Sequence, residues 1–137
     1  MLKLAGVTSK DVVYDLGCGD GRIVIAAARD FGARGVGIDI AAPHIDDARV
    51  LAENAGVAHK VHLAVGDIFT TEIRDATVVA LYLLPDLNLK LRPRLLSELK
   101  PGTRIVSHAF DMGGWKPDKI DVVDGSRIFL WTVPEKN

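Results

Sequence analysis

The chain has 137 residues, 48% of them hydrophobic and 26% charged, and its 17 basic and 18 acidic residues leave a net charge of −1. This composition is typical of one soluble globular domain, and the balanced charge gives no general attraction to nucleic acid or to an anionic membrane. The longest mainly apolar run, residues 76–84, is too short to span a bilayer, no signal peptide precedes the first expected strand, and the one cysteine indicates a reducing, cytoplasmic location.

A glycine-rich turn follows the first expected strand. Residues 9–16 are expected to form that strand, because β-branched and aromatic side chains run into an acid, Asp15. A helix is expected over residues 20–31, with Asp20 as its N-cap and Gly32 as its stop. The turn consists of Gly17, Cys18, Gly19, Asp20 and Gly21. Closely spaced glycines lose much chain entropy on folding, so we expect this turn to bring a ligand directly against the backbone; the alternative is a tight turn that binds nothing.

The spacing of the glycines favours a cationic ligand over a dinucleotide. A dinucleotide-binding turn has the spacing G-x-G-x-x-G and places a pyrophosphate at the helix N-terminus, whereas here the spacing is G-x-G-x-G and Arg22 stands where that pattern has its last glycine. Asp15 and Asp20 flank the turn with negative charge, which disfavours a pyrophosphate. S-Adenosylmethionine carries an ammonium and a sulfonium group and suits the turn better than the cofactor of a nicotinamide-dependent oxidoreductase or a plain nucleotide-binding module. We expect Cys18 to fill space rather than act as a nucleophile, because no histidine is near it in sequence.

An acid ends the second expected strand, residues 35–39. Asp39 lies 22 positions after the first glycine of the turn, with Ile40 beside it. An acid at about that distance can accept hydrogen bonds from ribose hydroxyls; the alternative is an Asp that caps a helix. Pro43 suits the first turn of the next helix, which Gly56 is expected to end.

The rest of the chain alternates apolar runs with turns. Strands are expected over residues 60–65, 76–83 and 103–107, followed by a hairpin of residues 119–123 and 127–133 around Asp124-Gly125-Ser126. A leucine-rich helix is expected to continue to Leu99 and to restart or kink at Pro93. Its basic residues Lys90, Arg92 and Arg94, with Lys100 beyond it, are expected to form a solvated face. These elements predict an α/β fold with a doubly wound, mostly parallel sheet, a C-terminal antiparallel hairpin and helices on both faces.

The pattern D-x-G-x-G-x-G at residues 15–21 resembles motif I of the class I, seven-strand S-adenosylmethionine-dependent methyltransferases. Asp39, Asp67, the sequence Leu-Lys-Pro-Gly at 99–102 and the terminal hairpin extend this resemblance over nearly the whole chain. The resemblance implies seven strands in the order 3-2-1-4-5-7-6, with the cofactor across the carboxyl ends of the first strands. It further implies that Asp67 accepts a hydrogen bond from the adenine amino group and that the backbone N–H of Ile68 meets the ring. The residues expected to bind the cofactor are Asp15, Gly17, Cys18, Gly19, Asp20, Gly21, Asp39, Ile40, Gly66, Asp67, Ile68 and Tyr82.

A narrower resemblance concerns the acceptor. Asp-Leu-Gly-Cys-Gly-Asp-Gly-Arg-Ile-Val at 15–24 and Trp-Lys-Pro-Asp at 115–118 are similar to a small group of protein-lysine methyltransferases, whose eukaryotic members methylate mitochondrial inner-membrane proteins. The resemblance implies a lysine of a protein as acceptor and S-adenosyl-L-homocysteine as product. All 137 residues are expected to form one cofactor-binding domain. Because the chain starts close to its first strand, we expect its N-terminal cover segment to be short or absent, and we expect no membrane anchor and no nucleic-acid partner.

Methyl transfer is an in-line displacement at an activated sulfonium, so positioning of the acceptor supplies much of the rate and no metal is expected. A lysine amine must lose a proton, since its free pKa is about 10.4. We expect an apolar tunnel to favour the neutral amine, with His108 or Asp111 taking the proton or holding the ammonium and Trp115 forming a wall; a purely structural role for each is the alternative. The tunnel is expected to pass Tyr82 and to include Leu83, Leu84 and Pro85.

Other acceptors and other roles are also open. Leu-Leu-Pro-Asp at 83–86 replaces the Asn/Asp-Pro-Pro-Tyr/Phe that enzymes acting on adenine N6 or glutamine often carry after the fourth strand, which counts against that chemistry. A small-molecule methyltransferase is one alternative. The other is a non-catalytic relative that binds the cofactor and serves as a scaffold or subunit.

Overall fold

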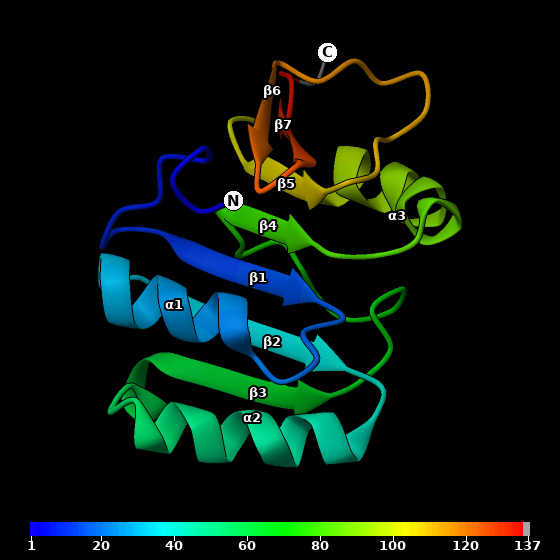
Figure 1. Ribbon diagram of the computed structural model, residues 1–137. Coiled ribbons are helices and arrows are strands. Elements are labelled where there is room, and N and C mark those ends of the chain that lie inside the picture. Colours follow the sequence, from blue (N-terminus) through cyan, green and yellow to red (C-terminus); the bar gives the residue numbers. More distant parts are fainter. Residues whose placement is uncertain (136–137) are drawn as a thin grey trace.

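The computed structural model describes residues 1–135, which form a seven-stranded sheet in the order β3-β2-β1-β4-β5-β7-β6 (Figure 1). The strands are β1 (Val12–Leu16), β2 (Arg34–Asp39), β3 (Val61–Val65), β4 (Val78–Leu81), β5 (Arg104–His108), β6 (Lys119–Val123) and β7 (Ser126–Thr132). The helices are α1 (Arg22–Phe31), α2 (Ala42–Asn54) and α3 (Pro85–Glu98), with a short 3-10 helix η1 (Ala58–Lys60). Strands β1 to β5 pair in parallel, and β7 lies antiparallel to both β5 and β6. The predicted mostly parallel sheet, its order and its hairpin are confirmed.

Two apolar layers enclose the middle of the sheet. On one face, Ala27 of α1 shares a cluster with Val13 and Val78, and the first residues of the chain complete that cluster. On the other face, Leu91 and Leu95 of α3 pack into a larger cluster with residues from β1, β4, β5 and β7. Every residue of β4 is buried, as expected for a parallel strand covered on both sides. The carboxyl ends of β1, β2, β4 and β5 consequently meet at one edge of the sheet, where the candidate site lies (Figure 1).

The first strand is shorter than predicted. β1 begins at Val12 because the carboxylate of Asp11 accepts hydrogen bonds from the N–H of Thr8 and the hydroxyl of Thr77, both at 2.8 Å, and pairs with Arg104. These contacts hold residues 8–11 in a turn rather than a strand. Residues 2–6 also form turns.

The prediction that Asp20 caps α1 is wrong. The N-cap is Gly21, whose φ of 82° is left-handed, so the helix starts at Arg22. Asp20 instead accepts hydrogen bonds from Arg22, at 3.3 Å from the backbone N–H and 2.8 Å from Nε. The stop at Gly32 is confirmed, because Gly32 has a φ of 69°, its N–H donates to the carbonyl of Ala28, and the N–H of Ala33 donates to the carbonyl of Ala27.

Two other local signals have clear outcomes. α3 continues through Pro93 as one helix from Pro85 to Glu98. The proline removes the helical donor to the carbonyl of Leu89, and both residues are exposed, so water can replace the lost bond. The predicted hairpin turn is confirmed: Asp124 and Gly125 have φ values of 50° and 80°, which a two-residue turn of type I′ requires.

Candidate functional site

The glycine turn joins the end of β1 to α1 and is tied to the end of β2. The N–H groups of Gly17 and Cys18 donate to the carbonyl of Ile38 at 2.8 and 3.0 Å. Gly17, Gly19 and Gly21 have φ values of 82°, 55° and 82°, which side chains rarely adopt. A Cβ at Gly17 would lie 2.9 Å from a methyl carbon of Leu83, whereas a Cβ at Gly19 would meet no atom of the described residues within 4 Å. Gly19 therefore presents bare backbone to open space, as the approach of a ligand requires.

Asp39, at the end of β2, is held in its charged form. Its Oδ2 accepts the N–H of Gly19 at 2.9 Å, its Oδ1 accepts the N–H of Ala41 at 2.9 Å, and Nδ1 of His44 lies 3.3 Å from Oδ2. Burial alone would raise the pKa of Asp39, but the two N–H groups and His44 together keep it below its ordinary value. Its neighbour Ile40 is exposed.

Asp15 is the opposite case, a buried acid without a partner. The residue is 2% exposed, and its Oδ1 has no hydrogen-bond partner among residues 1–135. Burial, with the charges of Asp39 and Asp20, raises its pKa to about 7. A carboxyl in these surroundings would be stabilised in its charged form by a cationic ligand. This unpaired oxygen is the feature that best fits the ammonium and sulfonium of S-adenosylmethionine.

Cys18 lies inside the turn as a thiol. Burial raises its pKa to about 12, and Asp15 and Asp39 add to the effect. Its sulfur packs against Gly37 of β2, where an added Cβ would come within 2.9 Å of Sγ. The residue fills space between the turn and β2, and it lines the cleft described next.

A cleft of about 430 Å³ opens along the turn. Its lining consists of Asp15, Gly17, Cys18, Gly19, Asp20, Arg22, Ile23 and Tyr82. All of the predicted turn residues except Gly21, which is buried against Ala48, therefore line one cavity together with Tyr82 from the end of β4. Asp39 joins them through its bond to Gly19. Within the described residues, no group of three His, Cys, Asp or Glu side chains is arranged to hold a metal ion.

The predicted adenine-contacting segment follows β3 at the same edge of the sheet. Gly66 donates its N–H to the carbonyl of Asp39 at 3.0 Å, and the carboxylate of Asp67 accepts the N–H of Phe69 at 2.8 Å. Arg94 of α3 fixes this loop: its guanidinium donates to the carbonyls of Ile68 and Thr71 at 2.7 and 2.6 Å.

The prediction of a solvated basic face on α3 is wrong for two of its residues. Arg94 also pairs with Glu98, with Nε and Oε2 2.6 Å apart, and its side chain is only 18% exposed. Arg92 donates to the carbonyl of Met112 at 2.8 Å. Both arginines bind backbone carbonyls of loops that are distant in sequence, which helical periodicity does not reveal.

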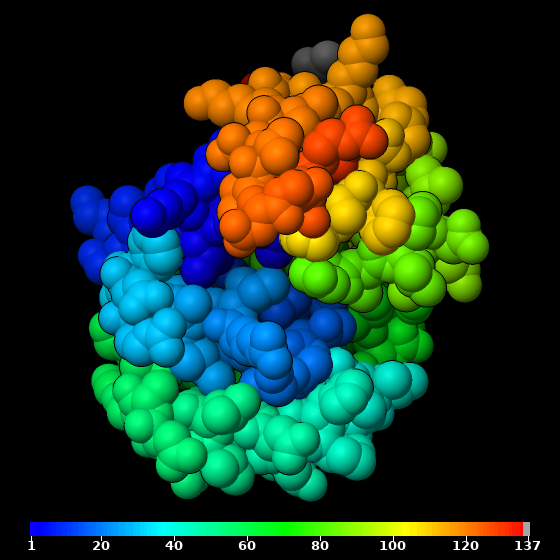
Figure 2. All heavy atoms as spheres, viewed as in Figure 1, coloured from blue at the N-terminus to red at the C-terminus, as the bar shows by residue number. Residues whose placement is uncertain are grey.

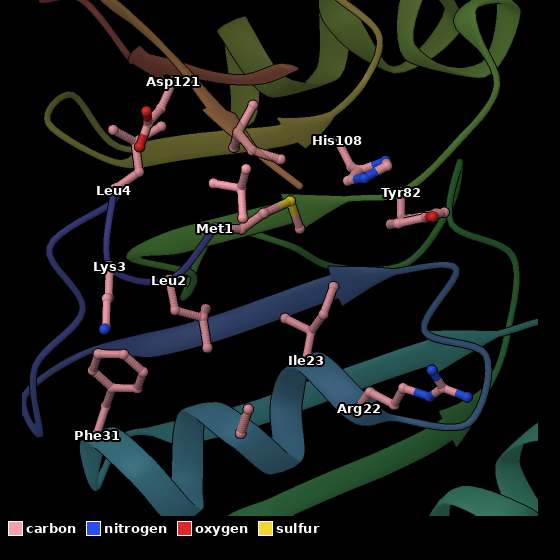
Figure 3. Close-up of a pocket in the computed structure, with 13 residues that line it drawn as sticks. Met1, Leu2, Lys3, Leu4, Arg22, Ile23, Phe31, Tyr82, His108 and Asp121 are labelled. Atoms are coloured by element: carbon pink, nitrogen blue, oxygen red, sulfur yellow. The ribbon is translucent and has the colours of Figure 1, made fainter. Parts of the chain in front are cut away.

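At the ends of β4 and β5, two of the predicted acceptor-side residues come together. The rings of Tyr82 and His108 stack with their centroids 4.2 Å apart (Figure 3). The carboxylate of Asp111 instead accepts the N–H of Gly113 at 3.1 Å, and its carbonyl accepts the amide of the buried Asn88. Asn88, which also donates to the hydroxyl of Ser107, is a residue that sequence reasoning missed.

The other predicted acceptor-side residues lie elsewhere. Trp115 packs against Trp131, with ring centroids 5.9 Å apart, and accepts the Trp131 indole N–H on its carbonyl at 2.8 Å. Trp131 belongs to the cluster that α3 covers, so the structure does not bring Trp115 to the Tyr82–His108 pair. Leu83 lies against the glycine turn, Leu84 is exposed, and Pro85 begins α3.

Residues 15–119 match the ANTKMT methyltransferase domain. The chain belongs to this family. It is 44% identical to a protein-lysine N-methyltransferase of Saccharolobus islandicus (strain REY15A), over 98% of this chain and 87% of that protein. It is 31% identical to the adenine nucleotide translocase lysine N-methyltransferase of Mus musculus over 88% of this chain, and it spans about half of that relative, 53%.

A solved structure agrees with this assignment to the ANTKMT family. The crystal structure of an RNA methyltransferase from Salinibacter ruber in complex with S-adenosyl-L-homocysteine has a TM-score of 0.97 and 54% identity, covering 99% of this chain and 89% of that one. This member of the ANTKMT family is thus an S-adenosylmethionine-dependent methyltransferase, as predicted from the glycine turn and the acids around it.

Proposed function

We propose that the protein transfers the methyl group of S-adenosylmethionine to the side-chain amine of a lysine in a protein substrate. The observation that carries this proposal is the 44% identity to a protein-lysine N-methyltransferase over 98% of the chain. The net charge of −1 and the acids at the cleft support a cationic amine over the phosphates of RNA as the incoming group.

Several residues would hold the cofactor in this proposal. Asp39 would accept hydrogen bonds from the ribose hydroxyls, with Ile40 against the same group, and Asp67 and the N–H of Ile68 would recognise adenine. The glycine turn and Asp15 would bind the methionine portion of the cofactor, which carries the ammonium and the sulfonium. When bound, S-adenosylmethionine supplies a methyl group already activated by its sulfonium.

His108 is the proposed base that takes the proton from the lysine amine. A lysine amine reacts only when its nitrogen lone pair is free, so the amine must first give up a proton. An imidazole nitrogen of His108 can take that proton and release it to water, while the stacked ring of Tyr82 holds the imidazole in place. Asp111 is the weaker candidate, because its carboxylate is engaged by the N–H of Gly113.

We further propose a reducing compartment such as the cytoplasm, which the single free and buried Cys18 supports. Among the described residues, none of the helices is long and apolar enough to cross a membrane.

The test is transfer of a labelled methyl group from S-adenosylmethionine to poly-L-lysine, to a cell lysate and to total RNA, followed by identification of the modified atom by mass spectrometry. We expect label on lysine Nε in polypeptide and none in RNA. Label in RNA alone would overturn the lysine assignment. Label only in a metabolite fraction would favour a small-molecule methyltransferase, and tight binding of S-adenosylhomocysteine with no transfer would favour a non-catalytic scaffold.

A further inference from the structure

A mainly apolar hollow of about 510 Å³ lies beside the cofactor cleft, on the face of the sheet that α1 covers. Its walls come from residues 1–4, from α1, from the ends of β4 and β5 and from the β6–β7 hairpin, which surround a recess on the surface (Figure 2). The apolar lining includes Leu2, Ile23, Ala26, Phe31, Val123 and Ile128. None of these residues was among the predicted site residues.

The hollow adjoins the cofactor cleft. Arg22, Ile23 and Tyr82 line both cavities. His108 lines only the hollow, and its ring stacks on that of Tyr82 at 4.2 Å. The Tyr82–His108 pair therefore marks the place where a molecule in the hollow would reach the methyl donor.

The far end of the hollow carries a negative charge. Asp121 of β6 lies beside Leu4, across the hollow from Tyr82 and His108 (Figure 3). Asp121 is exposed, and its Oδ1 accepts the N–H of its neighbour Val122 at 2.8 Å. Two nearby cations point elsewhere: Lys3 extends toward Phe31, and Arg22 is paired with Asp20, with Nε and Oδ2 2.8 Å apart. Met1 also lines the hollow; burial lowers the pKa of its N-terminal ammonium below the ordinary value, while the charge of Asp121 acts to raise that pKa.

We propose that this hollow is the acceptor channel, which receives the aliphatic stem of the target lysine after Asp121 has attracted its ammonium group. The inference rests on the proposed lysine methylation and assigns the surface that binds the lysine. Apolar walls suit the methylenes of lysine, and they strip water from the amine, which favours the neutral, nucleophilic form on the way to His108. A nucleotide would bring phosphates to Asp121 and polar edges to apolar walls, so the same features disfavour RNA.

The first test fills the hollow. Ala26→Phe places a ring in it from α1, at a position that does not line the cofactor cleft. With poly-L-lysine as probe, we expect kcat/KM to fall by roughly tenfold or more, while the Kd for S-adenosylhomocysteine stays within about twofold. The matched control is Ala58→Phe, which adds the same bulk at an exposed position of η1 and is expected to leave both quantities unchanged.

The second test removes the charge without changing the shape. Asp121→Asn is expected to lower kcat/KM for poly-L-lysine by about two- to fivefold at low salt, since exposed charge pairs contribute little, and the difference is expected to vanish near 1 M salt. Asp124→Asn, in the turn of the same hairpin, removes an acid that does not line the hollow and is expected to have no effect. Because Asp121 is on the surface, this variant stays informative if Ala26→Phe fails to fold.

The outcomes separate this inference from the function on which it rests. If the wild-type protein methylates no lysine, the proposed function fails. If the wild-type protein methylates poly-L-lysine while folded Ala26→Phe and Asp121→Asn retain its kcat/KM, the acceptor enters elsewhere and only the channel is refuted. Loss of S-adenosylhomocysteine binding in folded Ala26→Phe would assign the hollow to the cofactor and would also refute the channel.

Discussion

We expect the buried carboxyl of Asp15 to make cofactor binding depend on pH. Its pKa of about 7 means that the carboxyl is largely protonated at pH 6 and charged at pH 8. A cationic ligand favours the charged form, so binding at pH 6 must first remove a proton. If the carboxyl is charged in the complex, the apparent affinity rises about tenfold between pH 6 and pH 8, and close to one proton is released per ligand at pH 6.

Isothermal titration calorimetry with S-adenosylhomocysteine at pH 6, 7 and 8 measures both quantities, if each pH is repeated in buffers of different ionisation enthalpy. Asp15→Asn is the control, because it keeps the shape and every other titrating group, including His44 beside Asp39. We expect its affinity to be nearly independent of pH over this range. Equal pH dependence in the two proteins would refute the reasoning.

The same substitution also changes stability. In the unfolded chain an aspartate titrates near 3.9, whereas in the folded chain Asp15 titrates near 7. Between these values the folded state binds more protons, so its stability decreases as the pH rises from about 4 to 7 and stays reduced above. Asp15→Asn removes this loss, which is at most about 4 kcal/mol for three pKa units. We therefore expect its Tm relative to wild type to be higher at pH 8 than at pH 4.

Three further substitutions test the rest of the site. Asp39→Ala removes the acceptor for Gly19, so we expect the affinity for S-adenosylhomocysteine to fall by roughly 1–3 kcal/mol; unchanged affinity by calorimetry would remove Asp39 from the site. Arg94→Lys breaks the contacts that hold the loop after β3 and is expected to cost about 1–3 kcal/mol of stability in urea unfolding. Arg29→Lys, in an exposed pair, is the control and is expected to leave the unfolding midpoint nearly unchanged. Equal losses would contradict that role. Gly21→Ala forces a side chain into a φ of 82° with Ala48 at 3.0 Å, so we expect roughly 1–3 kcal/mol of destabilisation, and an unchanged Tm would show that the turn relaxes freely.

Local chemistry determined the parts of this fold that the sequence predicted well. Gly32 ends α1 and Asp124-Gly125 closes the hairpin because each needs a positive φ, and a sequence displays such needs directly. The glycine turn was predicted from its closely spaced glycines, and the position of Asp39 at the end of β2 was predicted from an apolar run that ends in an acid. The predicted N-cap of α1 was wrong by one residue. Asp20 and Gly21 could both occupy that position, and the structure has Gly21 there with a left-handed φ.

What the sequence could not predict depends on contacts between distant segments. The position of Arg94 in α3 is typical of a solvated helix face. Its guanidinium donates to the carbonyl of Ile68 because the loop after β3 packs against α3. Trp115 was expected to form a wall of the acceptor tunnel, but it packs on Trp131, whose side of the sheet is set by the register of β7 against β5. The apolar hollow beside the cleft is assembled from five separate parts of the chain, and the spacing within any one part does not reveal it.

The thiol enclosed by the glycine turn offers a built-in reporter of that turn. With a pKa of about 12 and little exposed surface, Cys18 has almost no thiolate near neutral pH. An alkylating reagent should therefore modify it only in molecules whose turn has swung away from β2. The rate of alkylation would count those openings, and a bound cofactor should slow it in proportion to its occupancy.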